Sequence, residues 1–337
     1  MPQAAGHNSV QAKRPVKGRF APSPTGRMHA GNIYAALVAW LVAKAQGGSM
    51  VLRIEDLDRQ RSRSEYADLV QRDFERLGLF WDEGPYYQSC RNDAYRSAYE
   101  QLEGSGLVYP CFCSRADLKA ASAPHAGEGS VYAGTCRGLS APQRATRLQE
   151  VLNEGRPGPA FRFNTGRAEA EAQCERGFSF TDLIQGPQRQ VPSATSGDFV
   201  LKRADGMFAY QLAVVVDDAE QGVTSVTRGV DLLSSCGSQM LLQRVLGFSH
   251  PEYCHVPLLV APDGRRLAKR NKDAGMEQLL CEYSTPKGVL GHVAYVAGLQ
   301  EEDAPASPND LLPSFKELVL RGELSQTYGQ IESIDWR

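Results

Sequence analysis

The stretch RFAPSPTGRMHAGN, residues 19–32, decides the fold expected for this chain. Residues 16–21 ahead of it allow a short strand, and the prolines and glycine within residues 22–28 predict a loop. Apolar residues then recur at helical spacing from Ile33 to Leu41, and Gly47-Gly48 ends the predicted helix. A strand, a loop and a helix in this order open the nucleotide crevice of a doubly wound parallel sheet of the Rossmann type.

The start of this helix is suited to phosphate, because free backbone N–H groups and the helix dipole favour anions there. We expect His29, Gly31 and Asn32 to bind the phosphates of a nucleoside triphosphate at this position. An imidazole at His29 can stabilise the charge that develops on a transferring group, which makes His29 a candidate catalytic residue. The alternative interpretation is that His29 is an ordinary helix cap and that the prolines form a rigid turn.

A second segment, RLAKR at residues 266–270, predicts a small basic loop. It belongs to a local patch whose cations are Arg265, Arg266, Lys269, Arg270 and Lys272. The formal net charge of the 337-residue chain is −2, so no overall positive field attracts nucleic acid, and any RNA binding must use local patches. A run of charges is usually only a solvated face.

The rest of the chain reads as alternating helices and strands. Met50–Ile54 is a predicted strand that ends at Glu55-Asp56, and Leu212–Val216 reads as a buried parallel strand. Other expected elements are helices near 66–78, 95–104 and 239–246, a strand at 223–227, a polar insertion with few periodic elements at 114–175, and peripheral helices over 280–337. The expected division is a disordered tail (1–17), a first half of the nucleotide-binding fold (18–110), an inserted subdomain (111–197), a second half (198–275) and a helical C-terminal region (276–337).

The eight cysteines include one pattern that suggests a metal site. Cys111-Phe112-Cys113 and Cys136 could supply three thiolates of a tetrahedral structural zinc site. Ordinary metal chemistry favours His125, in the intervening loop, as the fourth ligand. The other cysteines read as reduced thiols, because the chain is large and carries no export signal. No apolar run reaches membrane-spanning length, so we expect a cytoplasmic protein without membrane contact.

Residues 19–32 resemble the signature of the class I aminoacyl-tRNA synthetases in the form used by the glutamate-specific branch. Residues 266–270 resemble the second, lysine-bearing motif of that class, which implies a catalytic and ATP-binding role for Lys269. The resemblance extends over residues 18–275. It implies that ATP enters with Mg²⁺, and it favours Tyr132 over His125 as the fourth zinc ligand.

The resemblance also assigns a glutamate pocket to positions that contact this amino acid in the family. These are Arg19, Phe20, Ala21, Pro22 and Ser23 in the first motif, Glu55 in RIED, Tyr210 in FAYQLA, and Arg228 in TRG. A guanidinium can bind a carboxylate through two hydrogen bonds, and a carboxylate can pair with the α-ammonium group. Without the resemblance, the charged residues could equally be solvent-exposed and Tyr210 a core aromatic.

The chain ends 67 residues after Arg270, which is short for a protein that also carries helical domains for reading an anticodon. With the cysteine pattern, it resembles the glutamyl-queuosine tRNA(Asp) synthetases. That family activates L-glutamate without tRNA and transfers it to queuosine at the wobble position of tRNA(Asp). We therefore expect a monomer that binds the anticodon stem-loop, with candidate contacts at Arg137, Arg144, Arg147 and Lys269–Lys272.

Two departures and two alternatives remain. Ala268 replaces the serine of the usual lysine motif. In the histidine motif, the fourth residue is Asn32 instead of histidine, a change that the glutamate branch tolerates. The alternative functions are a truncated synthetase that charges tRNA(Glu) and a non-catalytic RNA-binding paralog.

Overall fold

The computed structural model describes six parts of the chain, namely residues 14–114, 117, 131–261, 267, 275–325 and 332–336. Several predicted features lie outside these residues. They are all five cations of the basic patch, including Lys269, together with His125 and the first 13 residues of the predicted tail.

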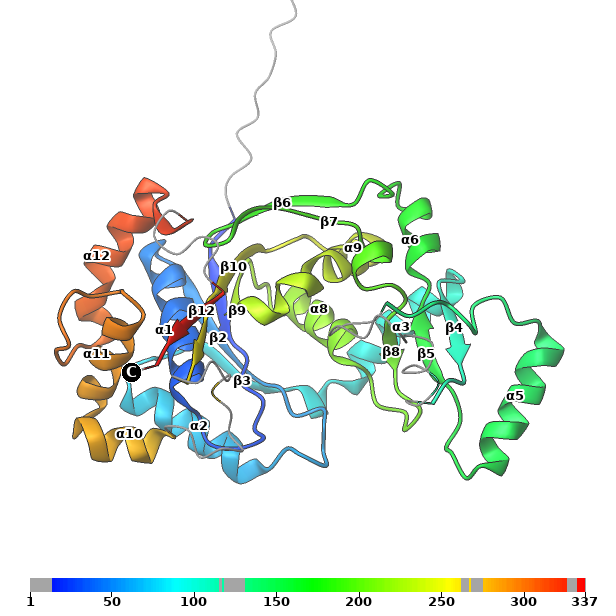
Figure 1. Cartoon of the computed structure of the whole chain (residues 1–337), viewed down its shortest axis with the longest axis horizontal. Coiled ribbons are helices and arrows are strands. Elements are labelled where there is room, and N and C mark those ends of the chain that lie inside the picture. The colour runs from blue at the N-terminus through cyan, green and yellow to red at the C-terminus, as the bar shows by residue number, and fades with distance from the viewer. Residues whose placement is uncertain are drawn as a thin grey trace, which may run out of the picture.

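The first half of the protein is a parallel sheet in the order β1 (Lys17–Phe20), β2 (Ser49–Ile54), β3 (Glu83–Tyr87). The crossovers contain α1 (Ala30–Ala45) and α2 (Ser64–Arg76). Helix α1 is apolar on every side and almost entirely buried, as expected for a helix at the centre of a fold. It packs against the sheet on one side and against the C-terminal helices on the other (Figure 1).

A second parallel pair, β9 (Ser225–Gly229) and β10 (Glu252–Val256), lies next to β1. The amide of Thr224 donates to the carbonyl of Lys17 at 2.9 Å, which joins the two halves at their amino-terminal ends. The strand order is therefore β3-β2-β1-β9-β10. Following the chain, β2 and β3 are added on one side of β1, whereas β9 and β10 are added on its other side, so the order of strand addition reverses between β1 and β9. Ligands bind at the carboxyl ends of the strands on either side of such a reversal.

The predicted strand at Leu212–Val216 is wrong. These residues lie in helix α8 (Tyr210–Glu220), which is followed by α9 (Cys236–Leu246). A short apolar run cannot distinguish a buried strand from a buried helix, and this helix is buried on all sides, including Asp217 and Asp218. The expected helices near 33–47, 66–78, 95–104 and 239–246 are confirmed as α1, α2, α3 (Asn92–Gly104) and α9.

The inserted part is built on an antiparallel sheet in the order β4 (Val108–Cys111), β5 (Ala160–Phe163), β8 (Val200–Lys202). Its other elements are α5 (Ala141–Asn153), α6 (Thr165–Glu171), the hairpin β6 (Phe178–Asp182) and β7 (Gly186–Gln190), and α7 (Pro192–Thr195). Residues 114–175 thus contain more regular structure than expected. The spacing of apolar residues did not predict helix α5, because only Val151 on it is buried.

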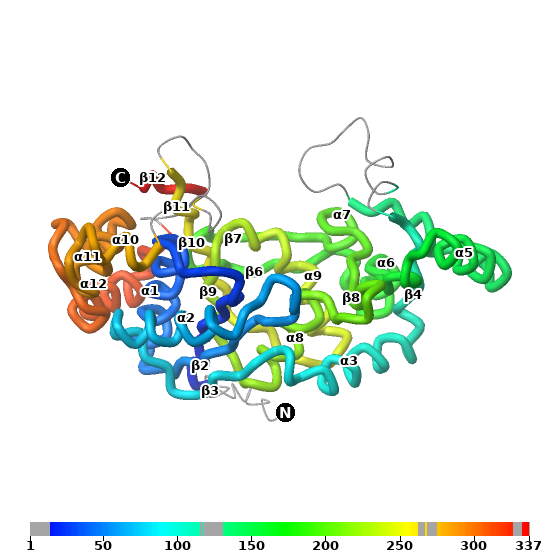
Figure 2. Tube along the Cα trace, turned by 90° about the horizontal axis from the view of Figure 1, so that it is seen from below, coloured from blue at the N-terminus to red at the C-terminus, as the bar shows by residue number. Residues whose placement is uncertain are grey.

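The C-terminal region contains α10 (Met276–Tyr283), α11 (Pro286–Val296) and α12 (Pro308–Arg321), as expected, together with one unexpected strand. That strand, β12 (Ser333–Asp335), pairs in parallel with β11 (Leu258–Val260). Two short 3-10 turns, η1 (Gln88–Cys90) and η2 (Val230–Ser235), complete the list. Figures 1 and 2 show the insertion and the C-terminal helices at opposite ends of an elongated molecule. Among the described residues, no helix combines the length and apolarity needed to cross a membrane.

Candidate active site

A cavity of about 400 Å³ opens at the carboxyl ends of β1, β2 and β9. It is lined by all eight residues predicted for glutamate, namely Arg19, Phe20, Ala21, Pro22, Ser23, Glu55, Tyr210 and Arg228, and by Asn32 from the predicted ATP set. Positions separated by about 200 residues therefore meet in one place, at the point of the sheet where parallel α/β folds bind ligands.

Arg19 lies on β1, lines this cavity and is 4% exposed. Its Nη1 donates to the carbonyl of Thr227 on β9 at 2.7 Å, and its Nε lies 3.7 Å from Asp218 Oδ1. Burial lowers the pKa of Arg19, but a guanidinium stays charged in proteins. The Nε atom is buried and has no hydrogen-bond partner within the described structure.

Glu55 supplies the negative charge. Arg53 Nη2 donates to its Oε1 at 3.2 Å, and the Glu55 amide donates to the carbonyl of Pro22 at 3.0 Å. The second bond fixes the loop after β1 against the end of β2. Burial raises the pKa of Glu55, while the positive charges of Arg53 and Arg19 oppose that rise.

A buried ionic network that the sequence did not reveal holds Arg53 in place. Its Nη1 donates to Asp218 Oδ1 at 2.7 Å and to Gln221 Oε1 at 3.0 Å, both on or next to α8. Asp217 in turn accepts hydrogen bonds from Gln88, Arg91 and Tyr95. The strand that carries Glu55 is thereby tied to the helix that carries Tyr210. Only a structure could reveal this, because the partners are more than 120 residues apart in the sequence.

The opposite wall is formed by Tyr210, the first residue of α8, and by Arg228 on β9. Arg228 Nη1 donates to the Tyr210 hydroxyl at 3.3 Å. The guanidinium is further held by the carbonyl of Leu232 at 3.3 Å and by Cys236 Sγ at 3.2 Å. Arg228 therefore reaches the cavity in one fixed orientation.

His255 and Asp182 stand behind Arg228 and were also missed by the sequence argument. Arg228 Nε donates to His255 Nε2 at 3.0 Å, and His255 Nδ1 lies 2.6 Å from Asp182 Oδ2. An arginine can only donate, so Nε2 is the acceptor and the ring proton resides on Nδ1, where it is donated to Asp182. Burial lowers the pKa of His255, which keeps the ring neutral. We call these residues the Asp182–His255–Arg228 triad.

His29 lies at the N-terminus of α1, as predicted, and caps it. Its Nδ1 accepts the Gly31 amide at 3.2 Å, and its own amide donates to Asn32 Oδ1 at 3.2 Å. His29 also forms a backbone bridge with Gly275, and the Met276 amide donates to the carbonyl of Met28 at 3.2 Å. Gly275 and Met276, which follow the lysine motif in the sequence, therefore lie against the histidine motif. Of the predicted ATP set, Asn32 lines the cavity and Lys269 lies outside the described residues.

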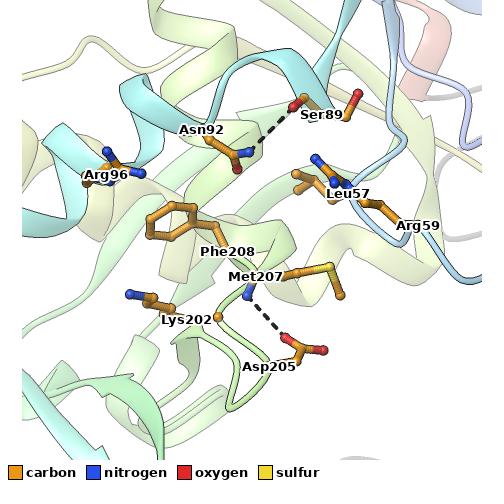
Figure 3. Close-up of a pocket in the computed structure, with 10 residues that line it drawn as sticks. Leu57, Arg59, Ser89, Asn92, Arg96, Lys202, Asp205, Met207 and Phe208 are labelled. Carbon is orange, nitrogen blue, oxygen red and sulfur yellow. Dashed lines mark hydrogen bonds between the residues drawn. The ribbon is translucent and has the colours of Figure 1, made fainter.

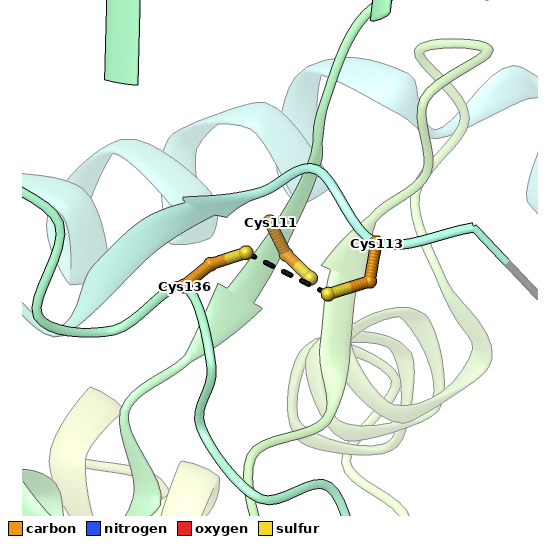
Figure 4. Close-up of side chains that lie close together, drawn as sticks. All are labelled: Cys111, Cys113 and Cys136. Carbon is orange, nitrogen blue, oxygen red and sulfur yellow. Dashed lines mark hydrogen bonds between the residues drawn. The ribbon is translucent and has the colours of Figure 1, made fainter. Parts of the chain in front are cut away.

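The three cysteines predicted to bind metal converge near the end of β4 (Figure 4). Their sulfur atoms all lie within 4.8 Å of one another, and Cys113 Sγ is 3.6 Å from Cys136 Sγ. The Tyr132 hydroxyl lies 3.4 Å from Cys111 Sγ and 3.7 Å from Cys113 Sγ, so it completes a four-atom cluster. The guanidinium of Arg162 covers the Tyr132 ring at 4.0 Å.

The predicted RNA contacts on the insertion are partly engaged elsewhere. Arg137 Nε donates to the buried Asp198 at 2.7 Å, and Arg147 Nη1 donates to Glu150 at 2.9 Å. These two arginines are bound to carboxylates on the insertion itself, which reduces the charge available to a phosphate.

Comparisons with known proteins show the family of the chain. The family model described as tRNA synthetases class I (E and Q), catalytic domain, matches residues 15–302. A glutamyl-Q tRNA(Asp) synthetase of Symbiobacterium thermophilum is 48% identical over 88% of this chain and 91% of its own length. The protein of the same name from Nitratidesulfovibrio vulgaris is 42% identical over 88% of this chain and 90% of its own length.

Solved structures of glutamate-specific tRNA ligases have a similar fold. A glutamate tRNA ligase from Elizabethkingia meningosepticum, in complex with its amino acid, superposes with a TM-score of 0.68 at 26% identity. The glutamate-tRNA synthetase of Elizabethkingia anophelis gives a TM-score of 0.70 at 26% identity. Each match covers 88–89% of this chain but only 64–65% of the longer ligase. The chain belongs to the glutamyl-Q tRNA(Asp) synthetase family, within the class I tRNA synthetases for glutamate and glutamine.

Proposed function

We propose that this protein activates L-glutamate with ATP, in the absence of tRNA, and transfers the glutamyl group to queuosine at the wobble position of tRNA(Asp). The observation that carries the proposal is the charge pattern of the cavity. Two fixed guanidiniums, Arg19 and Arg228, face one carboxylate, Glu55, across a space of about 400 Å³. Glutamate offers the complementary set, with two carboxylates and one ammonium group.

In this pocket Arg19 and Arg228 bind the two carboxylates, the Tyr210 hydroxyl adds a hydrogen bond, and Glu55 pairs with the α-ammonium group. Phe20, Ala21, Pro22 and Ser23 shape the wall along the first motif. Because Glu55, Arg19 and Arg228 are each held by buried partners, the substrate is oriented without rearrangement of the site. Orientation of this kind lowers the barrier to a bimolecular step.

The reaction itself is the attack of the glutamate α-carboxylate oxygen on the α-phosphate of ATP. A P–O bond forms to the carboxylate, the bond to the β-phosphate breaks, and pyrophosphate leaves. The N-terminus of α1, with Gly31 and Asn32, favours phosphate charge, and His29 and Lys269 stabilise it as it develops. Mg²⁺ enters with ATP and neutralises part of the triphosphate charge. A hydroxyl of queuosine then attacks the activated carbonyl and releases AMP.

We further propose that Cys111, Cys113, Cys136 and Tyr132 hold one structural zinc ion per chain. With Zn–S bonds of about 2.3 Å and Zn–O bonds of about 2.0 Å, tetrahedral edges are about 3.8 Å between sulfurs and about 3.5 Å between sulfur and oxygen. Three separations in the cluster match these edges, namely 3.6 Å from Cys113 Sγ to Cys136 Sγ and 3.4 and 3.7 Å from the Tyr132 hydroxyl to Cys111 Sγ and Cys113 Sγ, and all three sulfurs lie within 4.8 Å of one another. Four protein ligands leave no open position, so the ion would stabilise the insertion rather than react.

The experiment that tests the proposed function is transfer of labelled glutamate to tRNA(Asp) with and without queuosine. We expect transfer only to the modified tRNA, and glutamate-dependent ATP–pyrophosphate exchange with no tRNA present. Transfer to tRNA(Glu) that disappears when its 3′ adenosine is oxidised would instead identify a 3′-end-charging enzyme. Exchange with glutamate and ATP alone would exclude a non-catalytic RNA-binding protein.

A further inference from the structure

A second cavity, of about 350 Å³, is lined by residues from the loop after β2, from α3, from β8 and from the turn before α8 (Figure 3). Two short segments of the chain each contribute one residue to this cavity and one residue to the glutamate pocket. Leu57 follows Glu55 by two residues in the loop after β2, and Phe208 precedes Tyr210 by two residues in the turn before α8.

The wall of this second cavity is cationic. Arg59, Arg96 and Lys202 reach it from the loop after β2, from α3 and from β8 (Figure 3). The single lining carboxylate, Asp205, is already bound by Arg203 Nη2 at 2.8 Å and by the Met207 amide at 3.1 Å. A chain of net charge −2 thus concentrates positive charge at one opening next to its reacting centre.

Little within the described structure neutralises these cations. Arg59 is exposed and has no ion pair there. The Lys202 ammonium lies over the rings of Tyr99, at 5.4 Å, and Phe208, at 5.8 Å, and also has no carboxylate partner among the described residues. Arg96 pairs only with Asp93 at 3.3 Å, and both side chains are well exposed, so that pair is weak. The first residue of α3, Asn92, also faces the cavity, and a helix N-terminus favours an anion.

The cavity is separate from the place where ATP phosphates are expected. None of its lining residues belongs to the histidine motif at residues 29–32, which lies at the start of α1. An anion bound here would instead lie in the cavity that Leu57 and Phe208 line, each two residues from a residue of the glutamate pocket that the RNA acceptor must approach. Guanidinium groups bind phosphate through paired hydrogen bonds, and phosphate contacts fix the register of a nucleic acid.

We propose that this second cavity binds a backbone phosphate of the acceptor RNA, adjacent to the nucleoside that receives glutamate. The proposal rests on the proposed function for the presence of an RNA acceptor, but not on which tRNA it is. Its role is to position the RNA: a phosphate held by Arg59 and Lys202 sets how far the neighbouring nucleoside reaches into the glutamate pocket.

The test uses Arg59→Gln, Arg96→Gln and the Arg59→Gln/Lys202→Gln double variant. Arg321→Gln is the matched control, because Arg321, like Arg96, is an exposed helical arginine that pairs with a carboxylate one turn away. The RNA is whichever tRNA accepts glutamate from the wild-type protein, so an incorrect acceptor assignment leaves this test intact. Binding is measured by fluorescence anisotropy over a range of KCl concentrations, and activation by pyrophosphate exchange.

We expect the double variant to bind RNA about tenfold more weakly and to lose about 0.7 from the slope of log K against log salt, the amount for one single-strand phosphate contact. Its KM for ATP in the exchange reaction should equal that of the wild type and of Arg321→Gln. Wild-type RNA affinity and salt slope in the double variant would overturn the proposal. A raised KM for ATP with unchanged RNA binding would also overturn it, because the cavity would then hold phosphates of the nucleotide.

Discussion

Replacement of Asp182 by asparagine tests whether the Asp182–His255–Arg228 triad orients the guanidinium that binds substrate. Asp182 Oδ1 accepts the amides of Ile184, Gln185 and His255 at 2.9–3.1 Å, and Oδ2 accepts His255 Nδ1–H. An asparagine must keep its oxygen toward the three amides, so its NH₂ group faces the ring N–H. The ring then either loses that bond or moves its proton to Nε2, where it opposes Arg228 Nε–H.

One buried hydrogen bond is therefore lost or reversed, at a cost of about 1–3 kcal/mol. If the cost falls on the orientation of Arg228, the affinity for glutamate falls by about 5- to 150-fold. Arg228 is proposed to bind the same carboxylate before and during the reaction. The KM for glutamate should therefore rise, by about tenfold, while kcat changes little.

The assay is glutamate-dependent ATP–pyrophosphate exchange, with thermal unfolding measured in parallel. Asp303→Asn is the matched control, since Asp303 Oδ2 lies 3.0 Å from His292 Nδ1 in the C-terminal region, away from the cavity. That variant should keep the wild-type KM. A folded Asp182→Asn protein with unchanged KM for glutamate, or with a lower kcat at the wild-type KM, would refute the proposed positioning role.

Three further predictions concern metal, catalysis and pH. Elemental analysis should find one zinc per chain, and this zinc should be lost in Cys136→Ser and in Tyr132→Phe but kept in His125→Ala. Zinc kept in Tyr132→Phe and lost in His125→Ala would show that His125 is the fourth ligand. Lys269→Ala should slow pyrophosphate exchange by about 100-fold or more if Lys269 contacts transition-state charge, and a wild-type rate would remove it from the mechanism. Burial lowers the folded-state pKa of both His250 and His255, so the unfolded chain binds more protons below its ordinary histidine pKa of about 6.5. The contribution of these two histidines to the free energy of unfolding should therefore fall as pH drops from 7 to 5.5, so the wild type should lose more stability over this range than His250→Gln, and an identical pH dependence in that variant would contradict the assignment to His250.

The sequence predicted those parts of the site that lie in continuous motifs. The loop at residues 22–28 and the helix after it follow from local breakers and helical spacing, and the family resemblance supplied the pocket residues. The structure then placed the eight predicted glutamate positions around one cavity.

What the sequence could not predict depends on distant partners. Nothing in the spacing of Asp182 or His255 marks them, because each acquires its role only when the β6–β7 hairpin meets β10. Arg53 likewise reads as one charged residue within a strand, and its buried partners come from α8, 165 residues later. The apolar run at 212–216 was assigned to the wrong element because burial on all sides removes the periodicity that separates helix from strand.

The pairing of β12 with β11 has a practical consequence for handling the protein. Strand β11 ends at Val260, just before the segment that carries Lys269, and the Trp336 amide donates to the carbonyl of Val260 at 2.7 Å. Any peptide fused after residue 337 is therefore attached within a few bonds of the structure that leads into the lysine motif. An affinity tag, a surface tether or a fluorescent fusion at that end would exert force directly on β12 and on its pairing with β11. For kinetic work the tag belongs at the other end of the chain.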